Sequence, residues 1–199
     1  MSAINFPSLT PESQTFGIKY NTQISTSTIS GVSQVVEMPG ARWRGSISFS
    51  ELVPTDAALL QQFALELRGS AGLFLYGDLS RTDPQSTITG SLTVESPSTN
   101  RLVYTTPSSG IFTAGDYIQI GADNDNPELK MIIDVSGSAG SQQALTIEPA
   151  LRRTDYIGLS ITYSNPKTQF RLINEDQLIW SIRTKALLTD LTLDFLEFF

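Results

Sequence analysis

The chain has 199 residues, contains neither histidine nor cysteine, and carries a formal net charge of −7. Without these two residue types it has no disulfide, no thiolate metal site, no cysteine nucleophile and no Ser–His–Asp triad. The acidic balance has the wrong sign for wrapping a phosphate backbone, and no short window is rich in lysine or arginine. We therefore expect a structural or binding protein rather than an enzyme, with no catalytic, cofactor or metal residues and no sequence-specific contact with nucleic acid.

The N-terminal residues, MSAINFPSLTPESQ, lack the basic and apolar segments of a secretory signal. No run approaches the roughly 18 apolar residues that a membrane-spanning helix needs. The sequence thus predicts folding in a cytoplasm and no membrane span.

Alternation of apolar and polar residues with a period of two dominates the chain and predicts an all-β protein. It is clearest in 41–49, where Trp43, Ile47 and Phe49 share one face, and it recurs in 88–94, 157–163 and 191–195. Shorter predicted strands lie at 32–38, 73–76, 117–120, 129–135, 145–147, 168–173 and 178–182. Before the first of these, the Ser/Thr-rich segment 23–33 is either an exposed edge that pairs with a neighbouring molecule or an ordinary loop or hairpin. So many short strands favour a sandwich or a barrel.

One segment, PTDAALLQQFALELR at 54–68, has helical periodicity instead. Its expected apolar side contains Leu59, Leu60, Phe63, Ala64 and Leu67, with Thr55 or Asp56 as N-cap and Gly69 as the left-handed residue at the C-terminus. We expect a helix at about 55–68 that packs on a sheet.

Composition changes near Asp83–Gln85 and again near Glu148–Arg153. We interpret residues 86–153 as a small β-barrel or sandwich domain inserted into a β-sandwich formed by 1–85 and 154–199. A tandem of two small β domains is the alternative.

An acidic segment near the middle of the chain contains Asp116, Asp123, Asp125 and Glu128. Its oxygen atoms suit calcium, but the spacing fails the EF-hand pattern, so a solvated turn is the favoured interpretation.

Histidine-free glycoside hydrolysis needs only two carboxylates. Candidates are spread through the chain without a distinguishing context: Glu51, Glu66, Glu95, Glu128, Glu148, Asp176 and Asp194. Trp43 and Trp180 each lie on an alternating strand, so core packing is favoured over sugar stacking. Three late phenylalanines, Phe195, Phe198 and Phe199, indicate a last strand anchored in a core or in an interface.

The order of motifs resembles the tail proteins of long-tailed bacteriophages, most closely the distal tail protein. The motifs are a WxxxxxF strand (Trp43 to Phe49), an AxLLxxF helix (57–63), LRGxxGLF (67–74), AGDYIxIG (114–121), IEPALR (147–152), PKTQFRL (166–172), LIW (178–180) and a terminal LDFLE strand.

This resemblance implies a tail-tube-like β-sandwich with one flanking helix, assembled into a ring of six at the distal end of the tail. The ring would join the tail tube protein to hub and fibre proteins and leave a channel for DNA, which passes without specific binding. The expected location is the virion tail, after assembly in the host cytoplasm. A tail tube or baseplate protein, or a free carbohydrate-binding module, remains an alternative.

Overall fold

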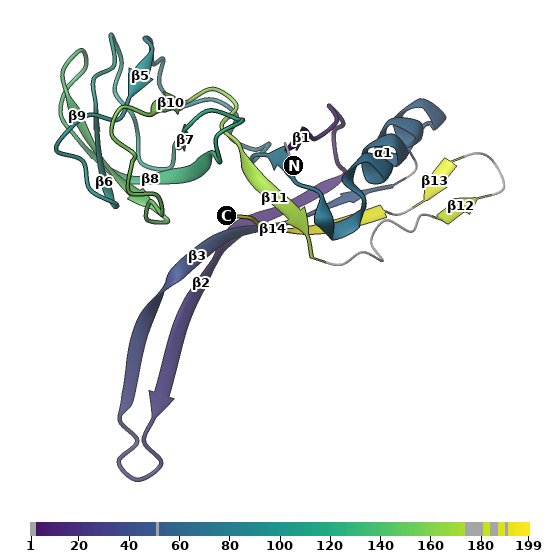
Figure 1. The fold of residues 1–199 in the computed structure, drawn as a ribbon, viewed down its shortest axis with the longest axis horizontal. Coiled ribbons are helices and arrows are strands. Elements are labelled where there is room, and N and C mark those ends of the chain that lie inside the picture. Colours follow the sequence, from purple (N-terminus) through teal and green to yellow (C-terminus); the bar gives the residue numbers. More distant parts are fainter. Residues whose placement is uncertain (1–2, 51, 174–180, 184–186, 190) are drawn as a thin grey trace.

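The computed structural model describes residues 3–50, 52–173, 181–183, 187–189 and 191–199. It confirms a mostly β protein with one α-helix. Two six-stranded sheets form two bodies side by side, and a long two-stranded arm projects from the first of them (Figure 1). A short hairpin, β12 (Ser181–Arg183) with β13 (Leu187–Thr189), lies near the helix.

The first sheet, here called the body sheet, has the strand order β1-β4-β11-β14-β3-β2. All its pairs are antiparallel except β1 with β4. Its strands are β1 (Ile4–Asn5), β2 (Ser13–Thr26), β3 (Ser33–Phe49), β4 (Phe74–Tyr76), β11 (Thr168–Leu172) and β14 (Leu191–Glu197). The alternation predicted for 41–49 and 191–195 is confirmed, because the apolar positions of both strands are buried on one face.

Helix α1 (Pro54–Leu67) covers the buried face of the body sheet. Proline suits its first turn, where no N–H bond is lost, and Arg68 ends the helix in the left-handed conformation with φ 53°. The predicted N-cap was wrong: Val53 occupies this position and makes no side-chain cap. Leu59 was also misplaced, since it is 50% exposed while Leu60 is buried. The buried side continues from Leu60 to residues three and four positions on, which turns Leu59 to the solvent.

The second sheet has the order β5-β10-β7-β8-β9-β6 and is antiparallel throughout. Its strands are β5 (Leu92–Thr93), β6 (Leu102–Thr105), β7 (Tyr117–Ile120), β8 (Glu128–Ser136), β9 (Gln143–Glu148) and β10 (Ser160–Thr162). A bridge between Glu95 and Tyr104 links the chain after β5 to β6, so the sheet curls into a near-barrel. We call this part the barrel. Its last strand, β10, lies beyond the boundary predicted at residue 153.

Two predicted strands in the barrel are much shorter than expected. In 88–94 only Leu92–Thr93 is a strand, and in 157–163 only Ser160–Thr162 is. A glycine in the left-handed region interrupts each segment, Gly90 at φ 111° and Gly158 at φ 84°. Strand backbone cannot pass through such a residue unchanged, so the ladder stops there. The alternation of buried and exposed side chains persists in 88–94, but Ile157, before Gly158, is 49% exposed instead of buried. Most of the predicted strand 178–182 lies outside the described residues.

Candidate assembly site

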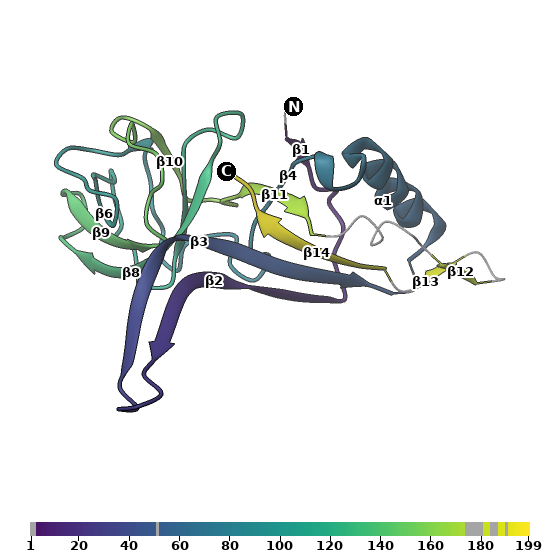
Figure 2. The ribbon, with the colours of Figure 1, turned by 60° about the horizontal axis from the view of Figure 1, so that its bottom comes forward.

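The arm is the outer part of the β2–β3 hairpin, residues 20–38, and it extends well beyond the body (Figure 1). Its ladder runs from Asn21 opposite Met38 to Thr26 opposite Ser33, after a register shift between Lys19 and Asn21. At the tip, the Ser27 N–H donates to the Val32 carbonyl over 2.9 Å. The arm bends to the side of the body sheet opposite α1, as Figures 1 and 2 both show.

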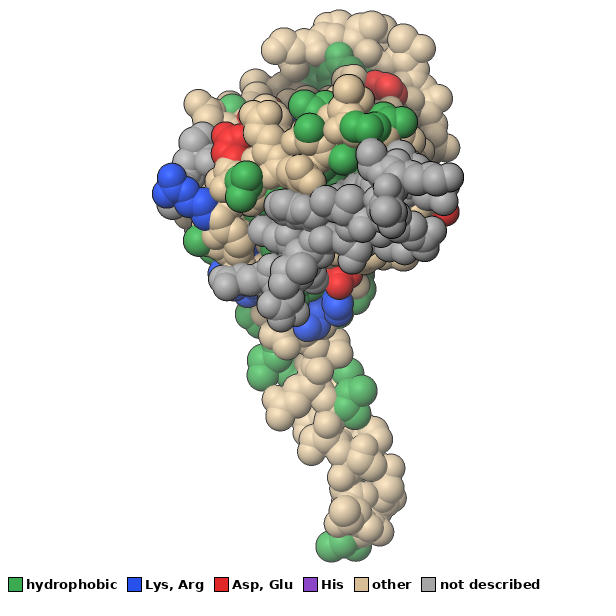
Figure 3. Space-filling view, turned by 90° about the vertical axis from the view of Figure 1, so that its right-hand side faces the viewer, with side chains coloured by type: hydrophobic (Ala, Val, Ile, Leu, Met, Phe, Trp, Pro, Cys, Tyr) green, Lys and Arg blue, Asp and Glu red, His purple; other side chains and the backbone are tan. Residues whose placement is uncertain are grey.

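The arm carries no charged side chain from residue 20 to residue 36. Its first charge is Glu37, at the root. Ile24 and Val35 face each other on one side of the hairpin and are 65% and 62% exposed, and Ile29 at the tip is 98% exposed. Further exposed apolar side chains are Tyr20, Val32, Val36 and Met38. In the space-filling view the arm below the body shows only apolar and uncharged surface (Figure 3).

Both long edges of the arm are open among the described residues. Strand β2 is the last strand of the body sheet, and β3 pairs with β14 only from Arg44 to Phe49. Natural proteins protect exposed strand edges with lysine, proline, bulges or covering segments. Apart from the shift and Pro39 at its root, this arm has none of these along its two paired segments, 21–26 and 33–38. The arm is therefore a template for pairing with another strand.

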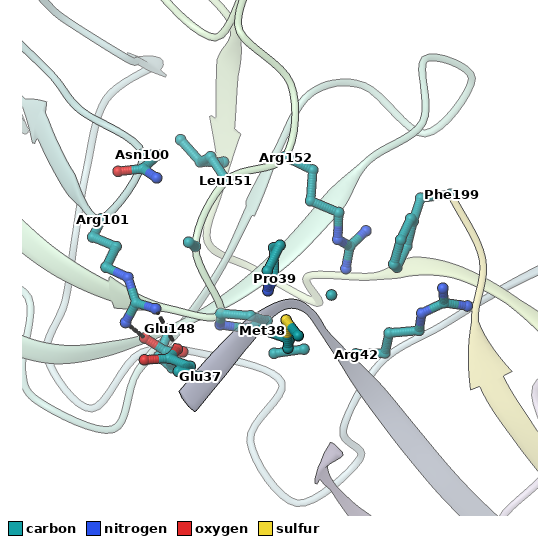
Figure 4. A pocket seen from close by; sticks show the side chains of 14 residues that line it. Glu37, Met38, Pro39, Arg42, Asn100, Arg101, Glu148, Leu151, Arg152 and Phe199 are labelled. Carbon is teal, nitrogen blue, oxygen red and sulfur yellow. Dashed lines mark hydrogen bonds and ion pairs between the residues drawn. The ribbon is translucent and has the colours of Figure 1, made fainter. Parts of the chain in front are cut away.

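The arm root is tied to the barrel by Arg101, as Figure 4 shows. Its guanidinium forms ion pairs with Glu37 of the arm over 2.7 Å and with Glu148 of β9 over 2.8 Å. The same residues border a cavity of about 750 Å³ between the arm root and the barrel, lined also by Arg42, Arg152 and Phe199. Arg101 and Glu37 are both largely exposed, so this contact adds only about 0–1 kcal/mol and orients the arm rather than holding it rigidly.

A buried polar junction joins the body sheet to the barrel. The Glu197 carboxylate at the end of β14 pairs with Arg152 at 2.5 Å and accepts hydrogen bonds from the Trp43 backbone N–H and the Thr168 hydroxyl. The Trp43 indole N–H donates to the Leu129 carbonyl of β8 over 2.8 Å. The ion pair of Arg152 with Glu197 and the hydrogen bond of the Trp43 indole link the body sheet to the barrel, so the two bodies hold a fixed relative position.

Beside this junction lies a second buried pair, Glu128 with Lys130 at 2.7 Å. Burial by itself raises the pKa of Glu128, but the Lys130 ammonium and the Arg152 backbone N–H outweigh it and hold that pKa below its ordinary value. Burial lowers the pKa of Lys130 in spite of its carboxylate partner. Burial, reinforced by Asp78, raises the pKa of Tyr117 to about 12.

The structure does not gather the acidic segment into a cation site. The Asp116 carboxylate is buried and accepts the N–H groups of Gln85 and Thr113, and Asp125 pairs with Arg153. Asp123 accepts a hydrogen bond from Gln119. In the described part of the chain no three acidic side chains converge on a point where a metal ion would fit.

The other candidate residues are also dispersed. Glu66 lies on α1, Glu95 follows β5, and Asp194 lies on β14. Glu128 and Glu148 are each paired with a cation, and Glu51 and Asp176 lie outside the described residues.

The aromatic candidates divide between core and surface. Trp43 is buried, as expected, and therefore offers no sugar-stacking surface. Trp180 lies outside the described residues. Phe195 is in the core of the body sheet, while Phe198 and Phe199 are partly exposed. The Arg152 guanidinium lies 3.4 Å from the centre of the Phe199 ring, so the chain end is fixed by a cation–π contact.

No protein-family model matches this chain, and no curated protein sequence is significantly similar to it. Among the described residues, α1 is too short and too polar to cross a lipid bilayer, and no other helix comes closer.

One sign of the arm is visible in the sequence, namely the uncharged run from residue 20 to residue 36. The structure places residues 23–33 in the outer part and tip of a hairpin whose edges are exposed. Their pairing with a neighbouring molecule stays a prediction. The length of the arm was missed because β2 between residues 13 and 22 was not predicted.

Proposed function

We propose that this chain is a structural subunit of a phage tail tip that assembles into a ring through its arm. The observation that carries the proposal is the uncharged arm with two open strand edges and exposed aliphatic side chains. A monomer gains nothing from such a surface, because exposed unprotected edges promote association. Pairing with another copy satisfies the edge N–H and C=O groups and covers Ile24, Val35 and Ile29 together.

The two edges of the arm are different strands, so pairing the β2 edge of one copy with the β3 edge of the next is head-to-tail. Head-to-tail contacts close into a ring if the rotation between copies fits, and otherwise extend as a filament. The resemblance to distal tail proteins favours a closed ring of six around a channel for DNA. Its neighbours would be the tail tube protein on one side and hub or fibre proteins on the other.

The barrel fits this proposal as an attached domain rather than as part of the ring contact. It lies beside the body, on the side of the sheet from which the arm bends away (Figure 2). The buried junction through Glu197 and Trp43 gives it a fixed orientation, as a docking platform at a tail tip requires.

The first test is the solution mass of the full chain by light scattering, over a concentration series. One subunit has a mass of 21.7 kDa, and we expect a stable species of roughly 130 kDa, a closed ring of six subunits. A mass that keeps rising with concentration would favour a tail tube or baseplate protein that forms open tubes. A monomer at all concentrations, also after addition of tail tube protein, would refute self-assembly.

A further inference from the structure

The face of the body sheet opposite α1 brings together basic residues that are distant in sequence. Cross-strand pairs place Lys19 opposite Arg42, and the next row on the same face is Gly17, Arg44, Leu196 and Arg171. Residues directly opposite each other in an antiparallel pair share a face. Lys19, Arg42, Arg44 and Arg171 therefore lie on one surface, which we call the basic face.

None of these four cations has a carboxylate partner among the described residues. All the ion pairs of the described chain involve other cations, namely Arg101, Lys130, Arg152 and Arg153. Arg42 and Arg171 instead stack on aromatic rings, those of Phe199 and Phe198. One acidic residue, Asp194, shares the face, and it is engaged in an interaction of its own.

The position of Lys19 opposite Arg42 is unfavourable for the isolated chain. Like charges directly opposite each other in a sheet destabilise it by a few tenths of a kcal/mol, up to about 1 kcal/mol. In a chain with a net charge of −7, opposite-charge pairs would be easy to form, yet among the described residues four cations are gathered here without them. Such an arrangement is explained by an anionic partner that neutralises the face when it binds.

The remaining rows of the basic face indicate which kind of anion binds there. Its further rows are hydroxyl residues: Ser13, Ser48 and Thr192, then Thr15 and Ser46 beside Asp194. A Cβ at Gly17 would meet no atom within 4 Å. Above it lies a shallow hollow of about 570 Å³, bordered by Lys19, Arg44 and Ser46.

Lysine, arginine, serine and threonine side chains are the groups that contact nucleic-acid phosphates. A protein partner would call for buried aromatic or aliphatic anchors. The described residues of this face offer few such anchors: Leu196 is half-buried, and the partly exposed rings of Phe198 and Phe199 are already stacked against Arg171 and Arg42.

We propose that the basic face contacts the phosphate backbone of double-stranded DNA, weakly and without sequence preference. This proposal rests on the proposed function, because in a ring through which DNA passes one face of each subunit points toward the duplex. The acidic remainder of the chain keeps the contact weak. Its repulsion is limited by salt, since charges more than about 8 Å apart are largely screened at physiological ionic strength. A weak contact of this kind guides a moving duplex without retaining it.

The test is fluorescence anisotropy of a labelled 20-base-pair duplex, titrated with the full chain between 20 and 200 mM salt. Each neutralised phosphate contributes about −0.9 to the slope of log K against log salt, so up to four contacts give a slope of about −3 to −4. For Lys19→Gln/Arg44→Gln we expect a slope shallower by about 2 and at least about tenfold weaker binding at the lowest salt. The control Arg68→Gln/Arg81→Gln removes the same charge elsewhere and is expected to leave the slope unchanged.

Equal slopes for the two double variants, or no binding of the parent chain at 20 mM salt, would overturn the inference. Competition by polyglutamate as strong as by unlabelled DNA would also overturn it, in favour of an acidic protein partner. Circular dichroism of each variant checks the fold. Binding and mass are measured on the same samples, so a chain that stays monomeric but binds DNA refutes the ring alone. A ring that does not bind DNA refutes the basic face alone.

Discussion

Replacing Ile24 and Val35 by lysine is expected to leave the chain folded but unable to assemble. The two side chains lie directly opposite each other on the arm, and both belong to the surface that the next copy covers. Lysines here bring like charges together from every neighbouring arm, and such a juxtaposition costs several kcal/mol per contact. Since each 1.4 kcal/mol is a factor of ten, the dissociation constant should rise by about 100-fold or more. Light scattering should then show a monomer at concentrations where the parent chain is a ring.

The matched control is Ile133→Lys/Ile157→Lys, which changes two similarly exposed aliphatic residues of the barrel. It adds the same charge to the chain, so it separates an effect of the arm from an effect of net charge. We expect the control to assemble like the parent chain. If both double variants dissociated to the same extent, or if neither dissociated, the arm would not be the assembly surface.

Replacing Glu197 by alanine is expected to lower the free energy of unfolding by about 3–5 kcal/mol, the usual loss when one partner of a buried ion pair is removed. The change leaves Arg152 without its carboxylate, and it removes the acceptor of the Trp43 N–H and the Thr168 hydroxyl. For a chain of this length that corresponds to a melting temperature lower by about 6 to 20 °C. Urea unfolding followed by tryptophan fluorescence and by circular dichroism measures it.

Two variants make this experiment specific. Glu197→Gln keeps an acceptor but removes the charge, so its loss should be smaller than that of Glu197→Ala. Glu66→Ala, on the exposed side of α1, should change stability by no more than about 0.5 kcal/mol. A loss below about 1 kcal/mol for Glu197→Ala would mean that the junction does not hold the two bodies together.

The parts of the fold that sequence predicts well are those in which one face of an element is buried. The alternation in Ala41–Phe49 and Leu191–Phe195, and the helical spacing of Leu60, Phe63 and Leu67, correspond directly to one buried side. Predictions failed where local backbone overrides the pattern. Gly90 and Gly158 break predicted strands because their positive φ angles interrupt the ladder.

The arm could not be predicted in full because both of its faces are exposed. Nothing in a monomer requires alternation there, so the periodicity that marks other strands is weak. The polar junction and the basic face depend on long-range pairing. Arg152 pairs with Glu197, and Lys19 lies opposite Arg42, only because the sheets bring these residues together. Scattered basic residues in the sequence thus became one surface in the structure.

The most direct test of the central claim, that arms join copies of this chain into a ring, is electron microscopy of the purified full chain. We expect end-on images of closed rings of one size, each with a central channel, that are absent for Ile24→Lys/Val35→Lys. Open filaments, or single particles of monomer size at concentrations of tens of micromolar, would contradict the claim.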